Sequence, residues 1–262
     1  MKENKYDNEE FFLKYSQMDR SKRGLKGAGE WSELQKVLPD FASKRVLDLG
    51  CGYGWHCIYA AEHGAESVTG IDISEKMLET AGEKNSRYRR CAMEDLDFPK
   101  ESFDVVISSL AFHYVKDFEA LAEKISQWIV PGGKFVFSAE HPVFTSYGSQ
   151  DWYYDEDGEI LHFPVDRYFF EGKRDAVFLG EQVVKYHRTL TTYLNTLLRH
   201  GFVLRHITEP KPPEEMLDLP GMRDEMRRPM MLIVAAEKEA WNAGRRCDKG
   251  GGRGRAADTK KL

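Results

Sequence analysis

Short apolar runs and amphipathic stretches alternate along the first half of the chain. Apolar runs of strand length span residues 45–50, 67–72, 103–109 and 134–140, and a further short strand is predicted over residues 87–92. Apolar side chains at helical spacing predict helices over residues 55–64, 75–85 and 118–129, the last closed by Pro131-Gly132-Gly133. Ser74 precedes the second helix and suits its N-cap. This alternation favours a parallel sheet whose strands are joined by crossover helices.

The alternation stops after residue 140. Eleven aromatic residues lie among many charged ones between residues 141 and 187, and we expect this segment to be an insertion. An amphipathic stretch over residues 188–201 predicts another helix, and strands are predicted over 202–208 and 229–237. The loop between these two strands is rich in proline and carries no helix signal, so the strands are expected to pair in antiparallel fashion.

The composition of the 262 residues, 41% of them hydrophobic, fits one sizeable core with an insertion. The net charge is -5, but eight Lys or Arg and three Asp or Glu lie from Lys238 onward, so the body is near -10. An acidic body argues against a nucleic-acid substrate, and the basic tail is expected to be disordered. There is no run of eighteen apolar residues and no signal peptide, which predicts a cytoplasmic protein away from membranes. The four cysteines match neither a zinc spacing nor a disulfide framework, so no metal site is predicted.

The sequence VLDLGCGYGWH, residues 46–56, places three glycines at alternate positions where the first predicted strand ends. Glycine allows a tight turn there and a close approach of backbone to a ligand. The second strand ends at Asp72, where a carboxylate can hold two ribose hydroxyls. A dinucleotide fingerprint would need a glycine at position 55, which is Trp55. The pattern therefore predicts a nucleoside-binding α/β domain, whereas a nicotinamide-dependent oxidoreductase is disfavoured.

The spacing D-x-G-x-G-x-G from Asp48 to Gly54 resembles motif I of the class I S-adenosylmethionine-dependent methyltransferases. The resemblance extends over about residues 45–237 and implies a doubly wound α/β fold, with a seven-stranded, mostly parallel sheet and one antiparallel edge strand. It also implies S-adenosylmethionine as the cofactor and methyl transfer as the activity. The expected organisation is an N-terminal helical lid over residues 1–44, a methyltransferase domain over 45–237 with a substrate-lid insertion at 141–187, and a basic tail over 238–262.

The resemblance also assigns cofactor contacts. The loop under the amino-acid part of the cofactor comprises Gly50, Cys51, Gly52 and Gly54. Asp48 would meet the methionine ammonium or pin loop amides, and Asp72 would hold the ribose. Residues expected around the adenine are Ile73, Met77, Met93, Glu94 and Asp95, of which Asp95 is chosen for the amino group and Met77 also suits core packing.

Two further segments complete the predicted site. The fourth strand ends in SSLAFHYV, which resembles the family's motif IV region, and this resemblance implies that Ser109 and Leu110 line the sulfonium through backbone atoms. In the N-terminal segment, Tyr15 and Arg20 would touch the methionine carboxylate or the substrate, unless they only pack the lid.

Methyl transfer is an in-line displacement, so it needs alignment and exclusion of water, and a base only where the nucleophile carries a proton. His113 and His141 follow two strand ends that should face the same crevice. Each is a candidate base, with positioning of the substrate or structural hydrogen bonding as the alternatives. Glu140 is a third candidate partner or a loop anchor.

The acceptor is predicted to be a small organic molecule. The chain lacks the Asn/Asp-Pro-Pro-Tyr motif of amino-methylating nucleic-acid enzymes, the carboxylates of magnesium-dependent catechol methylases and the cysteine run of radical enzymes. The aromatic insertion could form the apolar walls of a pocket for such an acceptor, or it could pack on itself or on a dimer partner. A protein-directed methyltransferase and a non-catalytic sensor of S-adenosylmethionine remain as alternatives, and the chain is expected to be a monomer or a homodimer.

Overall fold

The computed structural model describes residues 4–82 and 86–240. Its centre is a seven-stranded sheet with the strand order β10-β11-β5-β4-β1-β2-β3. The strands are β1 (Arg45–Leu49), β2 (Ser67–Asp72), β3 (Arg87–Arg90), β4 (Phe103–Ser109), β5 (Ile129–Glu140), β10 (Phe202–Thr208) and β11 (Met231–Lys238). Strand β11 is antiparallel to both neighbours and lies beside the edge strand β10, whereas β1 to β5 pair in parallel. The predicted doubly wound α/β fold is confirmed.

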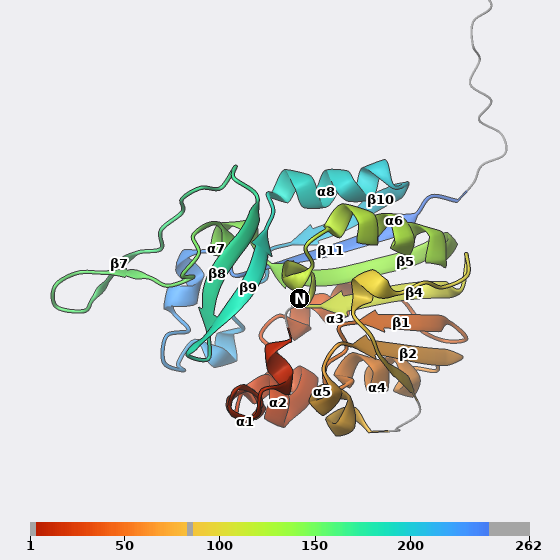
Figure 1. Ribbon diagram of the computed structural model, residues 1–262, viewed down its shortest axis with the longest axis horizontal. Coiled ribbons are helices and arrows are strands. Elements are labelled where there is room, and N and C mark those ends of the chain that lie inside the picture. Colours follow the sequence, from red (N-terminus) through yellow and green to blue (C-terminus); the bar gives the residue numbers. More distant parts are fainter. Residues whose placement is uncertain (1–3, 83–85, 241–262) are drawn as a thin grey trace, which may run out of the picture.

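Helices cover both faces of this sheet (Figure 1). One face packs on α6 (Phe118–Trp128) and α8 (Leu190–Arg199), and the other on α3 (Trp31–Val37) and α4 (Trp55–Glu62). Successive side chains of a strand point to opposite faces, so Leu47 joins the first cluster and Val46 the second. Helix α5 (Glu75–Ala81) follows β2. The sheet is therefore buried on both sides, as a parallel sheet requires.

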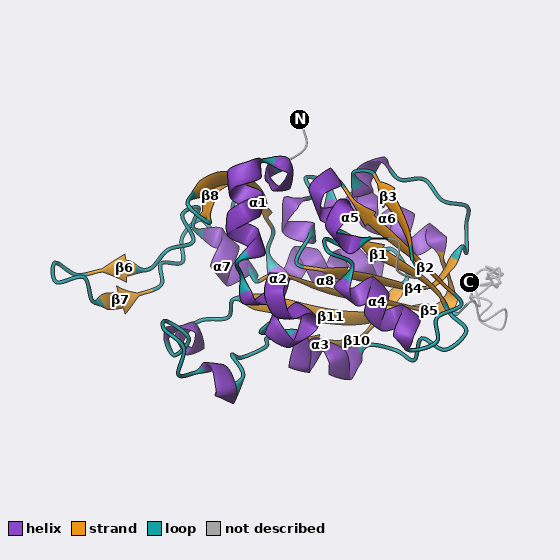
Figure 2. Cartoon of the chain, turned by 90° about the horizontal axis from the view of Figure 1, so that it is seen from below, coloured by secondary structure: helices purple, strands orange, loops and turns teal. Residues whose placement is uncertain are grey.

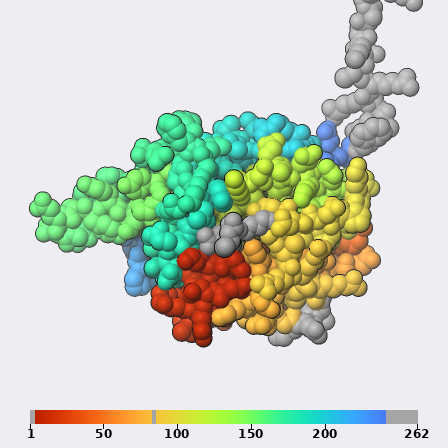
Figure 3. Space-filling view, viewed as in Figure 1, coloured from red at the N-terminus to blue at the C-terminus, as the bar shows by residue number. Residues whose placement is uncertain are grey.

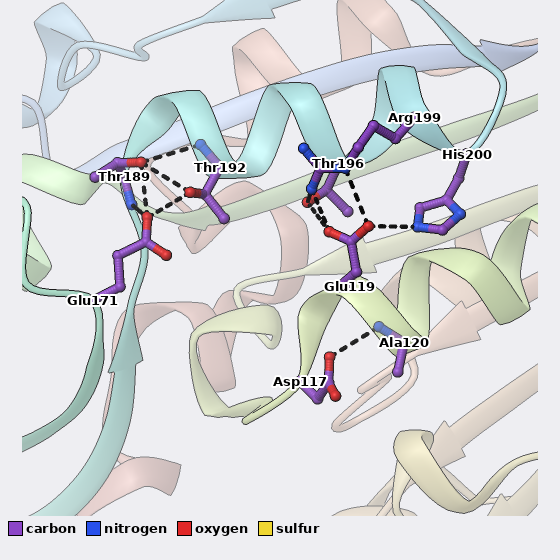
Figure 4. A network of polar contacts seen from close by, with 9 residues as sticks. All are labelled: Asp117, Glu119, Ala120, Glu171, Thr189, Thr192, Thr196, Arg199 and His200. Carbon is purple, nitrogen blue, oxygen red and sulfur yellow. Dashed lines mark hydrogen bonds and ion pairs between the residues drawn. The ribbon is translucent and has the colours of Figure 1, made fainter.

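Polar contacts fix α6 and α8, the two helices on one face of the sheet (Figure 4). Glu119 of α6 accepts a hydrogen bond from Thr196 Oγ1 at 2.8 Å and also contacts Arg199 and His200, so it joins α6 to α8. Thr189 caps α8 by accepting from the Thr192 N–H, and Asp117 caps α6 in the same way through the Ala120 N–H.

Most predicted elements are present, with differences at their ends. Ser74 accepts a hydrogen bond from the Met77 N–H, as the predicted cap of α5. That helix ends at Ala81, and residues 83–85 of its predicted range lie outside the described residues. The predicted start of the fifth strand at residue 134 is wrong, because β5 already begins at Ile129 and includes Pro131-Gly132-Gly133. The register between β4 and β5 shifts between Phe103 and Val105, and this irregularity accommodates the three residues within the strand.

The insertion has two parts, apart from the short helix α7 (Pro142–Ser146). An arm with β6 (Tyr153–Tyr154) and β7 (Ile160–His162) projects from the body (Figures 1 and 2). A hairpin of β8 (Gly172–Phe178) and β9 (Glu181–His187) packs instead on the N-terminal helix α1 (Glu9–Ser16), where Phe11, Ala176 and Val183 form a small buried cluster. Figure 3 shows this hairpin and the N-terminal segment in contact on the surface.

Short helices complete the rim of the sheet. They are η1 (Lys5–Asp7), α2 (Asp19–Arg23), η2 (Gly24–Gly27), η3 (Met93–Asp95), η4 (Phe112–Tyr114), η5 (Glu214–Met216) and η6 (Asp224–Arg227). None of the helices in residues 4–82 and 86–240 has the length and apolar character needed to span a membrane. The predicted tail from residue 238 lies outside the described residues beyond residue 240.

Candidate functional site

A cavity of about 660 Å³ lies at the carboxyl ends of the parallel strands. Its walls come from the ends of β1, β2, β4 and β5, from the N-terminal segment and from the loop between β10 and β11. This is the edge at which open α/β sheets bind ligands, because the strand order reverses there between β4 and β1.

The glycine loop forms the floor of the cavity through Gly50 and Gly52. Gly52 has φ +53°, and a Cβ added to it would meet no atom within 4 Å, so this backbone borders open space. Gly54 has φ +73° and starts α4 outside the cavity lining. A Cβ there would lie 2.2 Å from the Tyr88 hydroxyl oxygen, so only glycine fits.

Asp72 lies beside this loop and lines the cavity together with Ile73 and Met77. Its carboxylate accepts hydrogen bonds from the Gly52 and Ser74 N–H groups, both at 2.8 Å. Burial raises the pKa of Asp72, although these N–H groups oppose the shift. The backbone thus fixes the carboxylate where it can accept two further donors from a ligand.

Four of the predicted cofactor residues do not line the cavity: Asp48, Cys51, Gly54 and Asp95. Asp48 is buried behind the glycine loop, where it accepts a hydrogen bond from Cys57 Sγ at 3.3 Å. Burial raises the pKa of Asp48 to about 7. The carboxylate therefore bonds to a side chain of α4, and its predicted roles toward the loop amides and the cofactor stay predictions.

The predicted residues at the ends of β3 and β4 do line the cavity. They are Met93, Glu94, Ser109 and Leu110. Leu110 has φ +50°, a rare conformation for a side chain of this size, and its N–H donates to Ser138 O at 2.9 Å and Ser138 Oγ at 3.1 Å. These bonds hold a strained backbone at the centre of the site.

The N-terminal segment closes one side of the cavity. Tyr15 and Arg20 line it as predicted, and Arg20 pairs with Glu30, which is 1% exposed. Burial raises the pKa of Glu30, but the Arg20 guanidinium, a backbone hydrogen bond and His56 together outweigh it and hold the pKa below its ordinary value. Ser109 Oγ donates to the same carboxylate at 3.3 Å. Glu30 was not among the predicted site residues, because only the folded chain brings it beside Ser109.

The two candidate histidines have different surroundings. His113 lines the cavity, and burial lowers its pKa to about 4, so the ring is neutral at neutral pH. The Glu140 N–H donates to its Nδ1 at 3.5 Å, and Glu140 Oε1 lies 3.8 Å from its Nε2. His141 is not part of the cavity wall: its Nδ1 accepts from the Val143 N–H at 3.0 Å and caps α7. The structure therefore brings His113 and Glu140 together at the cavity and places His141 outside it.

The far half of the cavity is mainly apolar, and the sequence analysis did not predict its walls. Phe178 of β8 contributes, and the β10–β11 loop supplies the rest. The prolines and methionines of this loop that line the cavity are Pro210, Pro212, Pro213, Met216, Pro220, Met222 and Met230, and Met231 joins them from the start of β11. The four methionines in and next to this proline-rich loop could have indicated a binding surface from the sequence alone. Methionine side chains are flexible and can adapt to ligands of different shape.

The fold and the site define a nucleoside-binding α/β protein, and the comparisons specify it further. Residues 47–137 match the family model of a methyltransferase domain. A solved structure from Listeria monocytogenes, assigned to the S-adenosylmethionine-dependent methyltransferases, is 55% identical, with a TM-score of 0.78 over 82% of this chain and 99% of that one. An S-adenosylmethionine-dependent methyltransferase from Mesorhizobium loti is 43% identical, with a TM-score of 0.75 over 82% of this chain and 100% of that one.

A curated relative from Haemophilus influenzae, of uncharacterised function, is 32% identical over 244 residues, 89% of this chain and 96% of its own length. The chain belongs to the S-adenosylmethionine-dependent methyltransferases. It is therefore a methyltransferase with S-adenosylmethionine as its cofactor, as the glycine motif predicted.

Proposed function

We propose that this methyltransferase acts on a small-molecule acceptor that occupies the apolar half of the cavity. The observation that carries the proposal is the extension of the cavity beyond the predicted cofactor residues, under the β10–β11 loop and Phe178. Its total volume of about 660 Å³ falls in the usual range of small-molecule sites, roughly 300–1,000 Å³. An apolar wall with a few convergent polar groups is typical of such sites.

The half of the cavity that the glycine loop borders is suited to the cofactor. Gly52 leaves space for a ligand against its backbone, and Asp72 keeps two fixed carboxylate oxygens beside it. We propose that Asp72 holds the ribose hydroxyls, that Met93 and Glu94 border the adenine, and that Arg20 faces the amino-acid end. When bound, S-adenosylmethionine supplies a methyl group on a positively charged sulfur.

The residues around the reacting atoms then have to align the acceptor and exclude water. The hydrogen-bonded Leu110 backbone provides a rigid wall, and the N-terminal segment over residues 1–44 serves as the lid on the proposed site. For a hydroxyl acceptor, the neutral ring of His113 and the carboxylate of Glu140 act as one proton-accepting pair. Glu140 Oε1, 3.8 Å from Nε2, favours a proton on His113, whereas burial and the cations of Lys185 and Arg188 oppose it and keep the pKa near 4. His141 holds α7 instead.

The test uses cofactor labelled on the transferred methyl group. A cell extract is divided by ultrafiltration into metabolites and macromolecules, and each fraction is incubated with the protein. We expect label in a compound of the metabolite fraction, together with release of S-adenosylhomocysteine. Label only in the macromolecular fraction would favour the protein-directed alternative. Tight binding of S-adenosylhomocysteine without transfer in either fraction would favour the sensor alternative.

A further inference from the structure

The carboxylate of Glu140, which lines the acceptor half of the cavity, is neutralised from within the protein. Lys185 Nζ lies 2.5 Å from Glu140 Oε1, and the two side chains are 3% and 13% exposed respectively. Gln150 completes the arrangement, because its Nε2 donates to Glu140 Oε2 at 2.8 Å and its Oε1 accepts from Lys185 at 2.7 Å. Both carboxylate oxygens and the ammonium group therefore already have partners.

A second carboxylate of the same half, Glu225, is neutralised by Arg228. The guanidinium donates to both carboxylate oxygens, at 2.7 and 3.0 Å, and the Arg228 side chain is 6% exposed. The guanidinium centre lies 4.5 Å from the ring of Phe144, 4.7 Å from Phe163 and 5.0 Å from Trp152. The aromatic insertion thus holds the cation that balances a carboxylate of the β10–β11 loop.

These pairs leave little uncompensated charge for an acceptor to meet. Asp72 and Glu94 belong to the proposed cofactor half, Arg20 pairs with Glu30, Asp19 lies 3.5 Å from Arg23, and Lys211 is exposed to water. A charged acceptor group would lose its hydration on entering the apolar half without gaining a buried counter-charge there. An uncharged group of the same size loses much less hydration.

We propose that the acceptor is an uncharged molecule with an apolar body, and that Lys185 and Arg228 set this preference by neutralising Glu140 and Glu225. The proposal rests on the function proposed above, since it concerns the acceptor half of that site. Lys185 acts through Glu140 and is a specificity-determining residue, not one that touches the reacting atoms.

The test compares three probes of nearly equal size: 2-naphthalenemethanol, 2-naphthoate and 2-naphthylmethylammonium. Binding of each is measured at neutral pH by calorimetry and by the shift in melting temperature, with S-adenosylhomocysteine present. For the natural protein we expect the alcohol to bind at least tenfold more tightly than either charged probe. A charged probe that binds as tightly as the alcohol, or failure of the alcohol to bind, would overturn the proposal. Titration of S-adenosylhomocysteine alone and the labelled-methyl assay report separately on the proposed function.

Substitution of Lys185 provides the sharper measurement. Lys185→Met leaves Glu140 unbalanced, so the ammonium probe should gain at least tenfold relative to the alcohol. The double variant Glu140→Gln with Lys185→Met removes both charges and should restore the preference for the alcohol. Lys134→Met removes a half-exposed partner of Glu237 outside the cavity and is the matched control, with no expected change in preference.

Lys185→Met alone leaves the buried Glu140 carboxylate without its cation and can fail to fold for that reason. The double variant has no such unpaired charge, so it still allows the probes to be compared. An unchanged preference in a folded Lys185→Met protein, or a lasting preference for the ammonium probe in the double variant, would contradict the role of this pair.

Discussion

The carboxylate of Asp72 accepts a hydrogen bond from the backbone N–H of Gly52 at 2.8 Å. This bond joins the end of β2 to the glycine loop after β1, the two segments that carry the family's cofactor motif. The second oxygen accepts from the Ser74 N–H, which is at the start of α5. The proposed ribose contact therefore depends on a side chain whose position is set by two backbone segments, so it needs little reorganisation when the ligand binds.

Substitution of Asp72 by Asn should weaken binding of S-adenosylhomocysteine by more than tenfold. The amide keeps the shape of the side chain but removes its charge, and hydrogen bonds to a charged group contribute roughly 1.5–3 kcal/mol. Isothermal titration calorimetry measures the affinity. Glu75→Gln is the control, because Glu75 is also an acid near the start of α5 but pairs with Arg90 outside the cavity lining. Equal affinity of Asp72→Asn and the natural protein would contradict the ribose assignment.

Gly52→Ala should lower cofactor affinity with little change in packing. Gly52 has φ +53° and no atom within 4 Å of an added Cβ, so the methyl group would enter the space proposed for the ligand. The backbone strain itself costs roughly 1–2 kcal/mol. Gly158→Ala is the matched control, since Gly158 has φ +85° and equally open surroundings but lies in the arm, outside the cavity lining.

The two glycine variants should lose similar stability in urea unfolding, while only Gly52→Ala loses affinity in calorimetry. A cofactor affinity of Gly52→Ala equal to that of Gly158→Ala would show that the ligand does not approach this backbone.

Local sequence patterns were sufficient for the central sheet and for most of the residues that line the cavity around the glycine loop. The strands ending at Leu49, Asp72 and Ser109 are apolar runs, and the carboxyl ends of parallel strands lie at the same edge of a sheet. The residues that follow these strands could therefore be assigned to one site from the sequence alone. The cap at Ser74 was also predictable, because a single residue type at one position determines it.

The other walls of the cavity were not predictable, because contacts between distant segments create them. Glu30 becomes a wall of the site only when the N-terminal segment folds onto Ser109, 79 positions away. His113 and His141 follow strand ends in the same way, yet His141 is drawn out of the cavity by its bond to the Val143 N–H. Neither outcome leaves a periodic signal in the sequence.

The stability difference between Asp48→Asn and the natural protein should depend on pH. The pKa of Asp48 is raised by burial to about 7, above its value in the unfolded chain. Between about pH 4 and pH 7 the folded state therefore holds a proton that the unfolded state has lost, so this group reduces stability as pH rises through that window.

Asn does not titrate, so Asp48→Asn should gain stability relative to the natural protein between pH 5 and pH 8, by roughly 2–3 kcal/mol at 1.36 kcal/mol per pKa unit. Urea unfolding of the cofactor-free proteins at both pH values measures it, with the exposed Asp97→Asn as a control. A difference that stays constant with pH would contradict the raised pKa.

The buried pair of Arg20 and Glu30 should show strong and asymmetric coupling. The Glu30 side chain is 1% exposed and Arg20 is 24% exposed. Loss of Arg20 therefore leaves a buried carboxylate without its cation, whereas loss of Glu30 leaves a cation that can still reach water. Arg20→Met should consequently destabilise the protein more than Glu30→Gln.

A double-mutant cycle of these two changes, measured by urea unfolding, should give a coupling free energy of about 1–3 kcal/mol. The reference is the pair of Glu33 and Lys36 on α3, whose side chains are 35% and 65% exposed and whose coupling should stay below about 1 kcal/mol. If both cycles gave the same small value, the pair would not stabilise the fold of the N-terminal segment, and Glu30 would not depend on Arg20 for its place beside Ser109. The proposed lid would then have to be held by its aromatic contacts with the body, such as the edge-to-face packing of Tyr15 on Tyr53 at 5.8 Å.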